Sequence, residues 1–264
     1  MKGLLLVAVP IAAAVVVSSV ALYARAAGFS AGPEMGNVDG IASFLVSIVL
    51  LALLVFGLKR HPEKSARVIV AAVTVAGTLS GLILLKVSLQ ASGVPPALFL
   101  ATMPLGYLGL NWSLKGYFGS LSQRKTKVLM LGSASLLGAL IGSSLPAFIA
   151  VLFLLLLTSL DVLVIESNAL PTIVGQSGYD EVVSVATLPL DKYLVGLGDF
   201  LAYSVLASAS LRSLGIYGAV ETSGLILLGT ILTLQVTKWR KKASGLLIPI
   251  ALGLIPLILG LARI

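Results

Sequence analysis

Long apolar stretches alternate with short polar segments along the whole of this 264-residue chain. The stretches are about 17–22 residues long, which is the length of membrane-spanning helices and not of the roughly ten-residue strands of a barrel. The pattern predicts nine spans, at about 3–24, 41–58, 68–87, 96–114, 127–144, 146–166, 192–211, 216–236 and 244–262. The spans 127–144 and 146–166 nearly touch, which predicts a tight helical hairpin.

Composition narrows the class of protein further. Hydrophobic residues make up 58% of the chain and charged residues only 11%, whereas soluble domains carry about 25% charged residues. We therefore expect an all-α polytopic membrane protein, with residues 1–264 forming a single membrane domain. The chain has no cysteine, which excludes disulfides, thiol catalysis and thiolate metal sites. Its one histidine, His61, lies in a charged loop, so we expect neither a metal nor a cofactor.

The distribution of basic residues predicts the orientation in the membrane. The net charge is +8, but the basic residues stand in short segments between spans, which favours an effect of membrane topology over nucleic-acid binding. With the N-terminus in the cytosol and the C-terminus outside, 14 of the 18 lysines and arginines are cytosolic. These are Lys2, Lys59, Arg60, Lys64, Arg67, Lys115, Arg124, Lys125, Lys127, Lys192, Lys238, Arg240, Lys241 and Lys242. The outer side receives Arg25, Lys86, Arg212 and Arg263.

Two segments qualify this picture. The first span has features of a cleaved signal peptide, because Lys2 precedes it and Ala24-Arg25-Ala26 resembles a cleavage site, but its apolar run is longer than a usual signal core. The residues 167–191 predict a cytosolic loop between the sixth and seventh spans. Within that loop, the β-branched residues of 181–188 partly alternate and predict a short strand.

Two carboxylates fall inside predicted spans, where a charge costs roughly 2.5–3.5 kcal/mol on insertion scales. Asp161 lies about five residues from the cytosolic end of the sixth span, roughly 7–8 Å deep. Asp199 lies about seven residues into the seventh span, roughly 10 Å deep. The two spans are antiparallel and joined by one connection, so we expect adjacent helices that bring both carboxylates to nearly the same level.

Two carboxylates that share one site are expected to hold one proton between them at working pH. The ionised member can activate a water molecule, and the protonated member can polarise a peptide carbonyl. Gly196 and Gly198 leave backbone room beside Asp199 for an extended substrate.

The segment Gly196-Leu197-Gly198-Asp199, with Phe200 and Tyr203-Ser204-Val205-Leu206 after it, is similar to the GxGD segment of presenilin-type intramembrane aspartyl proteases. The nine spans, the cytosolic N-terminus and Asp161 near the end of the sixth span fit the same family. The related signal peptide peptidases resemble the same fold in inverted orientation, so the charge bias favours the presenilin branch. Without a large soluble part, the chain resembles a microbial, archaeal homologue.

The sequence departs from the family pattern at two places. The family has Tyr-Asp in the sixth span, whereas this chain has Leu160-Asp161, and its Tyr179-Asp180 falls in the predicted loop. Asp180 is thus the alternative to Asp161 as the partner of Asp199 in the catalytic pair. The Pro-Ala-Leu motif of the family appears only in degraded form. The resemblance assigns substrate binding to Gly196, Leu197, Gly198, Pro249, Ile250, Ala251 and Leu252.

The expected function is hydrolysis of peptide bonds within transmembrane segments by Asp161 and Asp199 at the cell membrane. The implied partners are single-span membrane proteins or peptides and the lipid bilayer, with no nucleic acid; a homo-oligomer stays open. Three alternatives also stay open. They are a secondary transporter with the two aspartates as an ion or proton relay, a prepilin-type GxGD peptidase, which carries a lysine where this chain has Leu201, and an inert scaffold.

Overall fold

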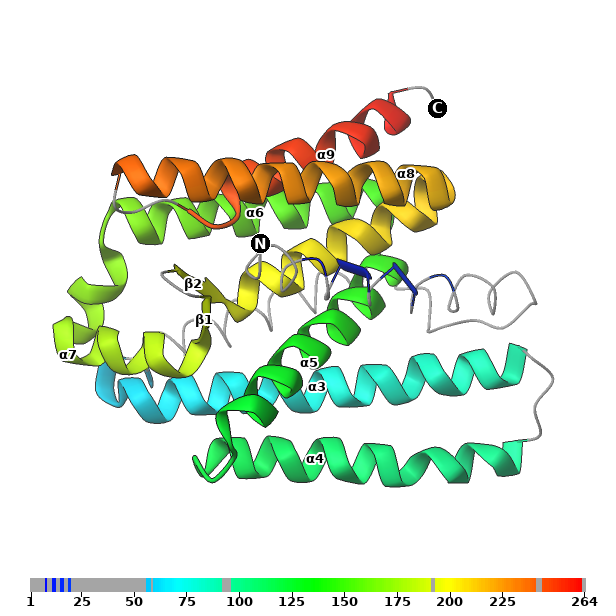
Figure 1. Cartoon of the computed structure of the whole chain (residues 1–264), viewed down its shortest axis with the longest axis horizontal. Helices are drawn as coiled ribbons and strands as arrows, with labels where there is room; N and C mark the ends of the chain where they lie inside the picture. The colour runs from blue at the N-terminus through cyan, green and yellow to red at the C-terminus, as the bar shows by residue number, and fades with distance from the viewer. Residues whose placement is uncertain are drawn as a thin grey trace.

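The computed structural model describes residues 56–57, 59–91, 96–190, 193–240 and 244–262, with isolated positions between 8 and 19. Within this part of the chain there are seven α-helices, one 3₁₀ helix and two short strands, so the protein is mostly helical (Figure 1). The elements in chain order are α3 (Pro62–Ala91), η1 (Pro96–Thr102), α4 (Met103–Tyr117), α5 (Gln123–Ser144), α6 (Ala147–Glu166), α7 (Ala169–Ala186), β1 (Thr187–Leu190), β2 (Tyr193–Gly196), α8 (Leu197–Arg240) and α9 (Leu247–Leu261).

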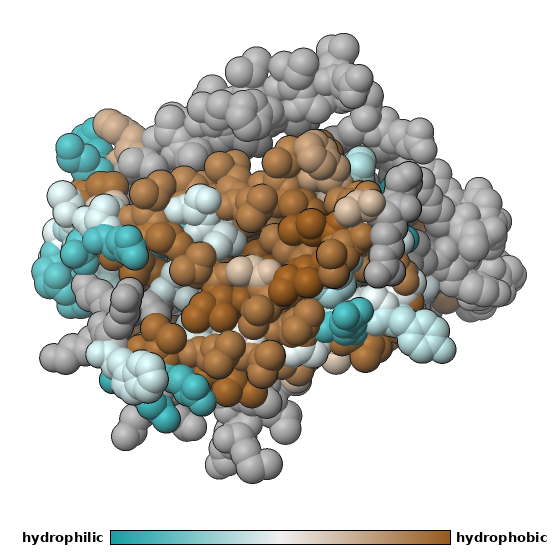
Figure 2. Space-filling view, turned by 90° about the horizontal axis from the view of Figure 1, so that it is seen from above, coloured by the Kyte–Doolittle hydropathy of each residue, from teal (hydrophilic) through white to brown (hydrophobic). Residues whose placement is uncertain are grey.

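Four of the described helices are long and apolar enough to cross a membrane, namely Pro62–Val87, Arg124–Ser144, Ala147–Glu166 and Leu197–Trp239. Helix α6 shows why a bilayer suits them, because it leaves large apolar side chains exposed along its length, among them Phe148, Leu152, Leu156 and Leu163. In water such a surface would be an aggregation site, whereas lipid tails cover it at no cost. Figure 2 shows hydrophobic residues over most of one face and hydrophilic residues toward its edges.

The predicted spans from the third onward fall on observed helices, although the boundaries shift. The span 68–87 lies within α3, 96–114 covers η1 and most of α4, 127–144 lies in α5, 146–166 in α6 and 244–262 around α9. The predicted spans 3–24 and 41–58, and the signal-peptide alternative, lie almost wholly outside the described residues. The described helices therefore do not reach the predicted count of nine, and they do not show on which side the termini lie.

Helix α8 contains a reversal of chain direction. Its 44 residues include Gly215 with φ 72° and ψ −167°, a backbone conformation that only glycine adopts readily. The Thr222 hydroxyl donates a hydrogen bond to the Ser210 hydroxyl at 3.0 Å across this point, so the second arm folds back along the first (Figure 1). The predicted spans 192–211 and 216–236 lie largely on these two arms, before and after Gly215, but residues 193–196 of the first span form strand β2 and the helix begins only at Leu197.

The segment 167–191 is not the predicted loop, and the predicted strand within it is mostly wrong. Residues 169–186 form α7, which is kinked at Gly175 (φ 74°), and only the residues from Thr187 onward are extended. Burial explains the error. The apolar side chains of Leu170, Val174, Val182 and Val185 recur at helical spacing and pack against Ala66 and Ile69 of α3. Tertiary packing thus overrides the strand preference of β-branched residues.

The true strands form a two-stranded antiparallel hairpin between α7 and α8. Thr187 pairs with Gly196, Leu188 with Val195, Pro189 with Leu194 and Leu190 with Tyr193. Its second strand ends at Gly196, and α8 begins at the next residue, so the hairpin leads directly into that helix.

Glycines set how closely the helices of the core approach. Gly138 and Gly142 of α5 face the first arm of α8, and a Cβ atom added at Gly142 would lie 2.3 Å from the carbonyl oxygen of Val205. Gly77 of α3 is packed as tightly against α5, since an added Cβ would lie 2.3 Å from the carbonyl oxygen of Ser133. These close contacts use the small-residue spacing that drives helix association in membranes.

The segments that carry Asp161 and Asp199 lie at the same end of the helix bundle. Gly178 of α7 lies against Pro62 at the start of α3, and Arg67 donates to the carbonyl oxygen of Tyr117 at the end of α4. The beginnings of α3, α5, α8 and α9 therefore gather with the ends of α4, α6 and α8 (Figure 1). The opposite end carries the carbonyl oxygens of Ser143 and Leu145, to which Arg212 donates at 2.9 Å each.

We predict that Gly142→Leu destabilises the bundle by about 1–3 kcal/mol, because its side chain collides with the backbone of α8. Gly132→Leu on the same helix is the matched control, since no atom lies within 4 Å of a Cβ added there. Detergent-titrated unfolding, followed by loss of helical circular dichroism, measures both variants. Equal stability of the two would contradict the close α5–α8 contact.

Candidate active site

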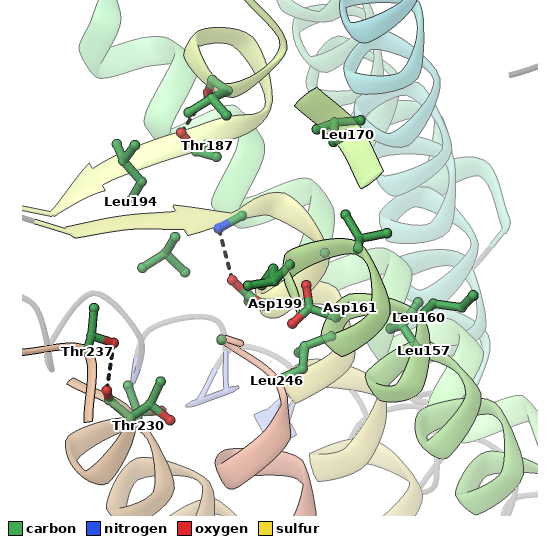
Figure 3. A pocket seen from close by; sticks show the side chains of 18 of the residues that line it. Leu157, Leu160, Asp161, Leu170, Thr187, Leu194, Asp199, Thr230, Thr237 and Leu246 are labelled. Carbon is green, nitrogen blue, oxygen red and sulfur yellow. Dashed lines mark hydrogen bonds between the residues drawn. The ribbon is translucent and has the colours of Figure 1, made fainter. Parts of the chain in front are cut away.

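A cavity of about 670 Å³ lies at the end of the bundle where the helices begin and end around Asp161 and Asp199 (Figure 3). Five parts of the chain line it: the last turns of α6, α7, the β1–β2 hairpin, both arms of α8 and the residues before α9. Most of the lining is apolar, and the two carboxylates lie side by side in it. A mostly apolar cavity with a few convergent polar groups is the usual form of a binding or catalytic site.

Asp199 is held by the way α8 begins. The helix starts at Leu197, so Gly196 precedes its first residue and Asp199 is the third. The Gly196 N–H donates to Oδ2 of Asp199 at 3.0 Å, which is the backward half of a capping box. A carboxylate in the first turn also faces the positive end of the helix dipole. The order of residues in Gly196-Leu197-Gly198-Asp199 thus fixes the position of this side chain.

Asp161 stands one and a half turns before the end of α6. The helix ends at Glu166, and Asn168 adopts the left-handed conformation (φ 48°) that turns the chain into α7. Asparagine is among the few non-glycine residues that tolerate this conformation. Asn168 also lines the cavity, together with Leu160 and Val164 of the same helix.

The segment before α9 touches both aspartates. The Ser244 hydroxyl donates to Oδ2 of Asp161 at 2.5 Å, and Ser244 Oγ accepts the Leu247 N–H at 3.1 Å. The next residue, Gly245, lies so close to the other carboxylate that an added Cβ would be 2.9 Å from both oxygens of Asp199. Two consecutive residues therefore bridge the pair of carboxylates, which come from different helices.

Side chains of α8 complete the polar part of the cavity. The hydroxyl of Tyr203, a buried residue one turn after Asp199, donates to the carbonyl oxygen of Gly245 at 2.8 Å. Thr230, Thr233 and Thr237 of the second arm line the opposite wall. Each threonine hydroxyl donates to the carbonyl oxygen four residues earlier.

Only some of the residues to which the resemblance assigns substrate binding line the cavity. Gly196 and Gly198 line the cavity, with open space around Gly198, whereas Leu197 is buried in the core. None of the residues 249–252 lines it. They lie inside α9, where Pro249 packs against Gly229 of α8. The cavity instead receives Gly245 and Leu246, so the residues that face it precede the degraded motif by one turn.

The rival pair Tyr179-Asp180 belongs to α7. Tyr179 lines the cavity, but Asp180 is not among its lining residues. Sequence reasoning also missed Tyr203, Ser244 and Gly245. A usable signal existed for Ser244, because a serine just before an apolar helical run is a helix-start signature.

Within the described ranges, no three His, Cys, Asp or Glu side chains cluster closely enough to hold a metal ion. No protein-family model matches the chain, and no curated protein matches it. The chemistry of the site therefore has to be inferred from its geometry. Two adjacent carboxylates in an apolar cavity at a helix start can hold one proton between them and hydrolyse a bound amide or relay a proton.

We predict that cysteines placed at both aspartate positions are cross-linked by a short bis-methanethiosulfonate reagent. The chain has no other cysteine, so the double variant Asp161→Cys/Asp199→Cys reports this pair alone. Asp180→Cys/Asp199→Cys is the matched control and should stay unlinked. Mass spectrometry of tryptic digests measures the linked peptide. Linkage of the control, with none in the first variant, would contradict the observed pairing.

Proposed function

We propose that the protein is an intramembrane aspartyl protease of the presenilin and signal peptide peptidase type. The observation that carries this proposal is that Asp161 and Asp199, from two different apolar helices, line one cavity and are bridged by Ser244-Gly245. The GxGD order supports it further, because it holds Asp199 at the start of α8. The substrates are single-span transmembrane proteins or peptides, and the location is the cell membrane.

The proposed reaction is hydrolysis of a peptide bond by one water molecule. The ionised carboxylate takes a proton from the water as its oxygen attacks the carbonyl carbon, while the protonated carboxyl donates a hydrogen bond to the carbonyl oxygen. The C–N bond of the tetrahedral intermediate then breaks, the leaving amine takes up the proton that the first carboxylate accepted from water, and a new carboxyl group remains. No metal takes part in this scheme, because two carboxylates and one shared proton supply the base and the acid.

The distribution of charge supports the proposed topology of nine spans, with the N-terminus in the cytosol and the C-terminus outside. Among the lysines and arginines of the described residues, ten stand at the end of the bundle that holds the aspartates. They are Lys59, Arg60, Lys64, Arg67, Lys115, Arg124, Lys125, Lys127, Lys238 and Arg240. Lys86 and Arg212 stand at the other end. By the positive-inside rule, the aspartate end faces the cytosol.

A substrate must expose its scissile bond, because a transmembrane helix keeps its peptide groups in its own hydrogen bonds. Extended backbone inside a membrane needs other partners. The β1–β2 hairpin supplies them by strand addition, and its register decides which edge is available.

The free edge of β2 is the better template for an added strand. The Gly196 N–H bonds to Asp199 and the Thr187 N–H bonds to the carbonyl oxygen of Val183, so both point away from their partner strand. Alternation along the ladder turns the backbone groups of Pro189 and Leu194 outward as well. Pro189 has no N–H to offer, whereas Leu194 offers both N–H and C=O at the cavity wall.

We predict that Asp161→Ala and Asp199→Ala each lower the cleavage rate by about a thousandfold or more, with the double variant no slower than either single one, because the pair acts as a unit. The rate is measured with a single-span peptide and the purified protein in detergent. Asp180→Ala is the matched control and should keep the wild-type rate. Normal cleavage by Asp161→Ala, or loss of activity in Asp180→Ala, would refute the assignment of Asp161 and Asp199 as the catalytic pair.

We predict that Leu194→Pro lowers kcat/KM about fivefold or more relative to Leu194→Ala. Both variants shorten the side chain, but only proline removes the outward N–H, and a hydrogen bond of this kind contributes about 1 kcal/mol. Steady-state kinetics on the same peptide measure the difference. Equal kcat/KM values for the two variants would refute strand addition at β2 and leave the aspartates untouched.

A further inference from the structure

The turn that joins α4 to α5 carries positive charge that no nearby acidic residue balances. Between Glu63 and Asp161 the sequence contains no aspartate or glutamate, but seven lysines and arginines. Four of these basic residues lie at the end of α4 and in the first turns of α5 (Figure 1), namely Lys115, Arg124, Lys125 and Lys127. Among the described residues, none of the four pairs with a carboxylate, since the ion pair in this region joins Arg67 to Glu63.

Contacts within the turn bring the positive groups of the two helices together. The Nζ atom of Lys125 lies 5.7 Å from the ring centroid of Trp112 on α4, within the range of a cation–π interaction. Lys115 follows Trp112 by three residues and therefore projects from the same face of α4. The turn is closed by the Ser120 N–H, which donates to the carbonyl oxygen of Lys115 at 2.9 Å. The lysines of α4 and α5 thus share one side of the turn.

Exposed aromatic rings stand beside these charges. Phe118, the first residue after α4, is 72% exposed, and Tyr117 packs against it edge to face with ring centroids 5.1 Å apart. An apolar ring so exposed is unfavourable in water, whereas aromatic rings gather at the headgroup level of a bilayer, at the ends of membrane helices. The rings therefore place the basic residues at the depth where lipid phosphates lie.

We propose that the α4–α5 turn is a binding surface for the headgroup of an anionic phospholipid. The lysines and arginine bind the phosphate, and the aromatic rings lie against the glycerol and the first carbons of the acyl chains. The charge of the surface selects the lipid, because an anionic headgroup gains from every cation, whereas the ammonium group of a zwitterionic headgroup is repelled. This inference concerns the membrane partner of the protein and does not depend on the proposed protease function.

The test uses the fluorescence of Trp112, which lies at the proposed surface. The chain has two tryptophans, so in the full-length variant Trp239→Phe the signal comes from Trp112 alone. This variant is titrated in detergent micelles with phosphatidylglycerol, and separately with phosphatidylcholine, each brominated near the headgroup end of its acyl chains so that contact quenches the fluorescence. Half-maximal quenching is expected at an about tenfold lower mole fraction of phosphatidylglycerol than of phosphatidylcholine.

Two matched sets of substitutions, both made in Trp239→Phe, locate the preference. The site variant is Arg124→Gln/Lys125→Gln/Lys127→Gln, and it should bring the two lipids to within about twofold of each other. The control, Lys59→Gln/Arg60→Gln/Lys238→Gln, removes equal charge from exposed residues at the same end of the bundle and should keep the full preference. Each variant is compared between the two lipids, so a change in its own fluorescence does not affect the result, and helical circular dichroism confirms that each is folded.

Three results would overturn the inference. Equal half-maximal quenching by the two lipids in Trp239→Phe would show that the surface does not select an anionic headgroup. An equal loss of preference in the site variant and the control would show general attraction by the charged end of the bundle and no binding surface at the turn. Reversal of the quenching by soluble glycerol phosphate would show that the occupant is a free anion and not a lipid.

Discussion

Two carboxylates in an apolar helical bundle constrain everything around them. Each must be given hydrogen-bond donors, because an unpartnered charge away from water is costly. The protein supplies those donors from the starts of two helices. The backbone of Gly196 serves Asp199 where α8 begins, and Ser244 serves Asp161 where α9 begins. The β-hairpin, the turn before α9 and the end of α6 all converge on the cavity as a result.

Close helix packing makes this convergence possible. The second arm of α8 returns along the first after Gly215, so one element contributes both Asp199 and the threonine wall of the cavity. Glycines of α3 and α5 remove the side chains that would hold these helices apart from their neighbours. The apolar faces that remain exposed, such as that of α6, suit lipid tails and not water.

The hydrophobic pattern was sufficient to predict most of the helices and the pair of aspartates. A carboxylate in an apolar run is conspicuous, and one connection between antiparallel spans places two of them at the same level. The pattern failed at α7, where β-branched residues suggested a strand and packing against α3 made a helix. The family resemblance was wrong about the start of α9, because it singled out Pro249, whereas the residues that contact the aspartates are Ser244 and Gly245. Ser244 carries a local helix-start signal, but contacts between segments far apart in sequence carry none, so neither contact with the aspartates could be predicted.

The most direct test of the central claim is cleavage of a single-span peptide by the purified protein in water enriched in ¹⁸O, followed by mass spectrometry of the products. One ¹⁸O atom is expected in the new carboxyl terminus. The cut is expected in the cytosolic half of the substrate span, because the proposed orientation turns the end of the bundle that holds Asp161 and Asp199 toward the cytosol. An intact peptide, or cuts clustered in the outer half of the span, would contradict the proposed function and orientation.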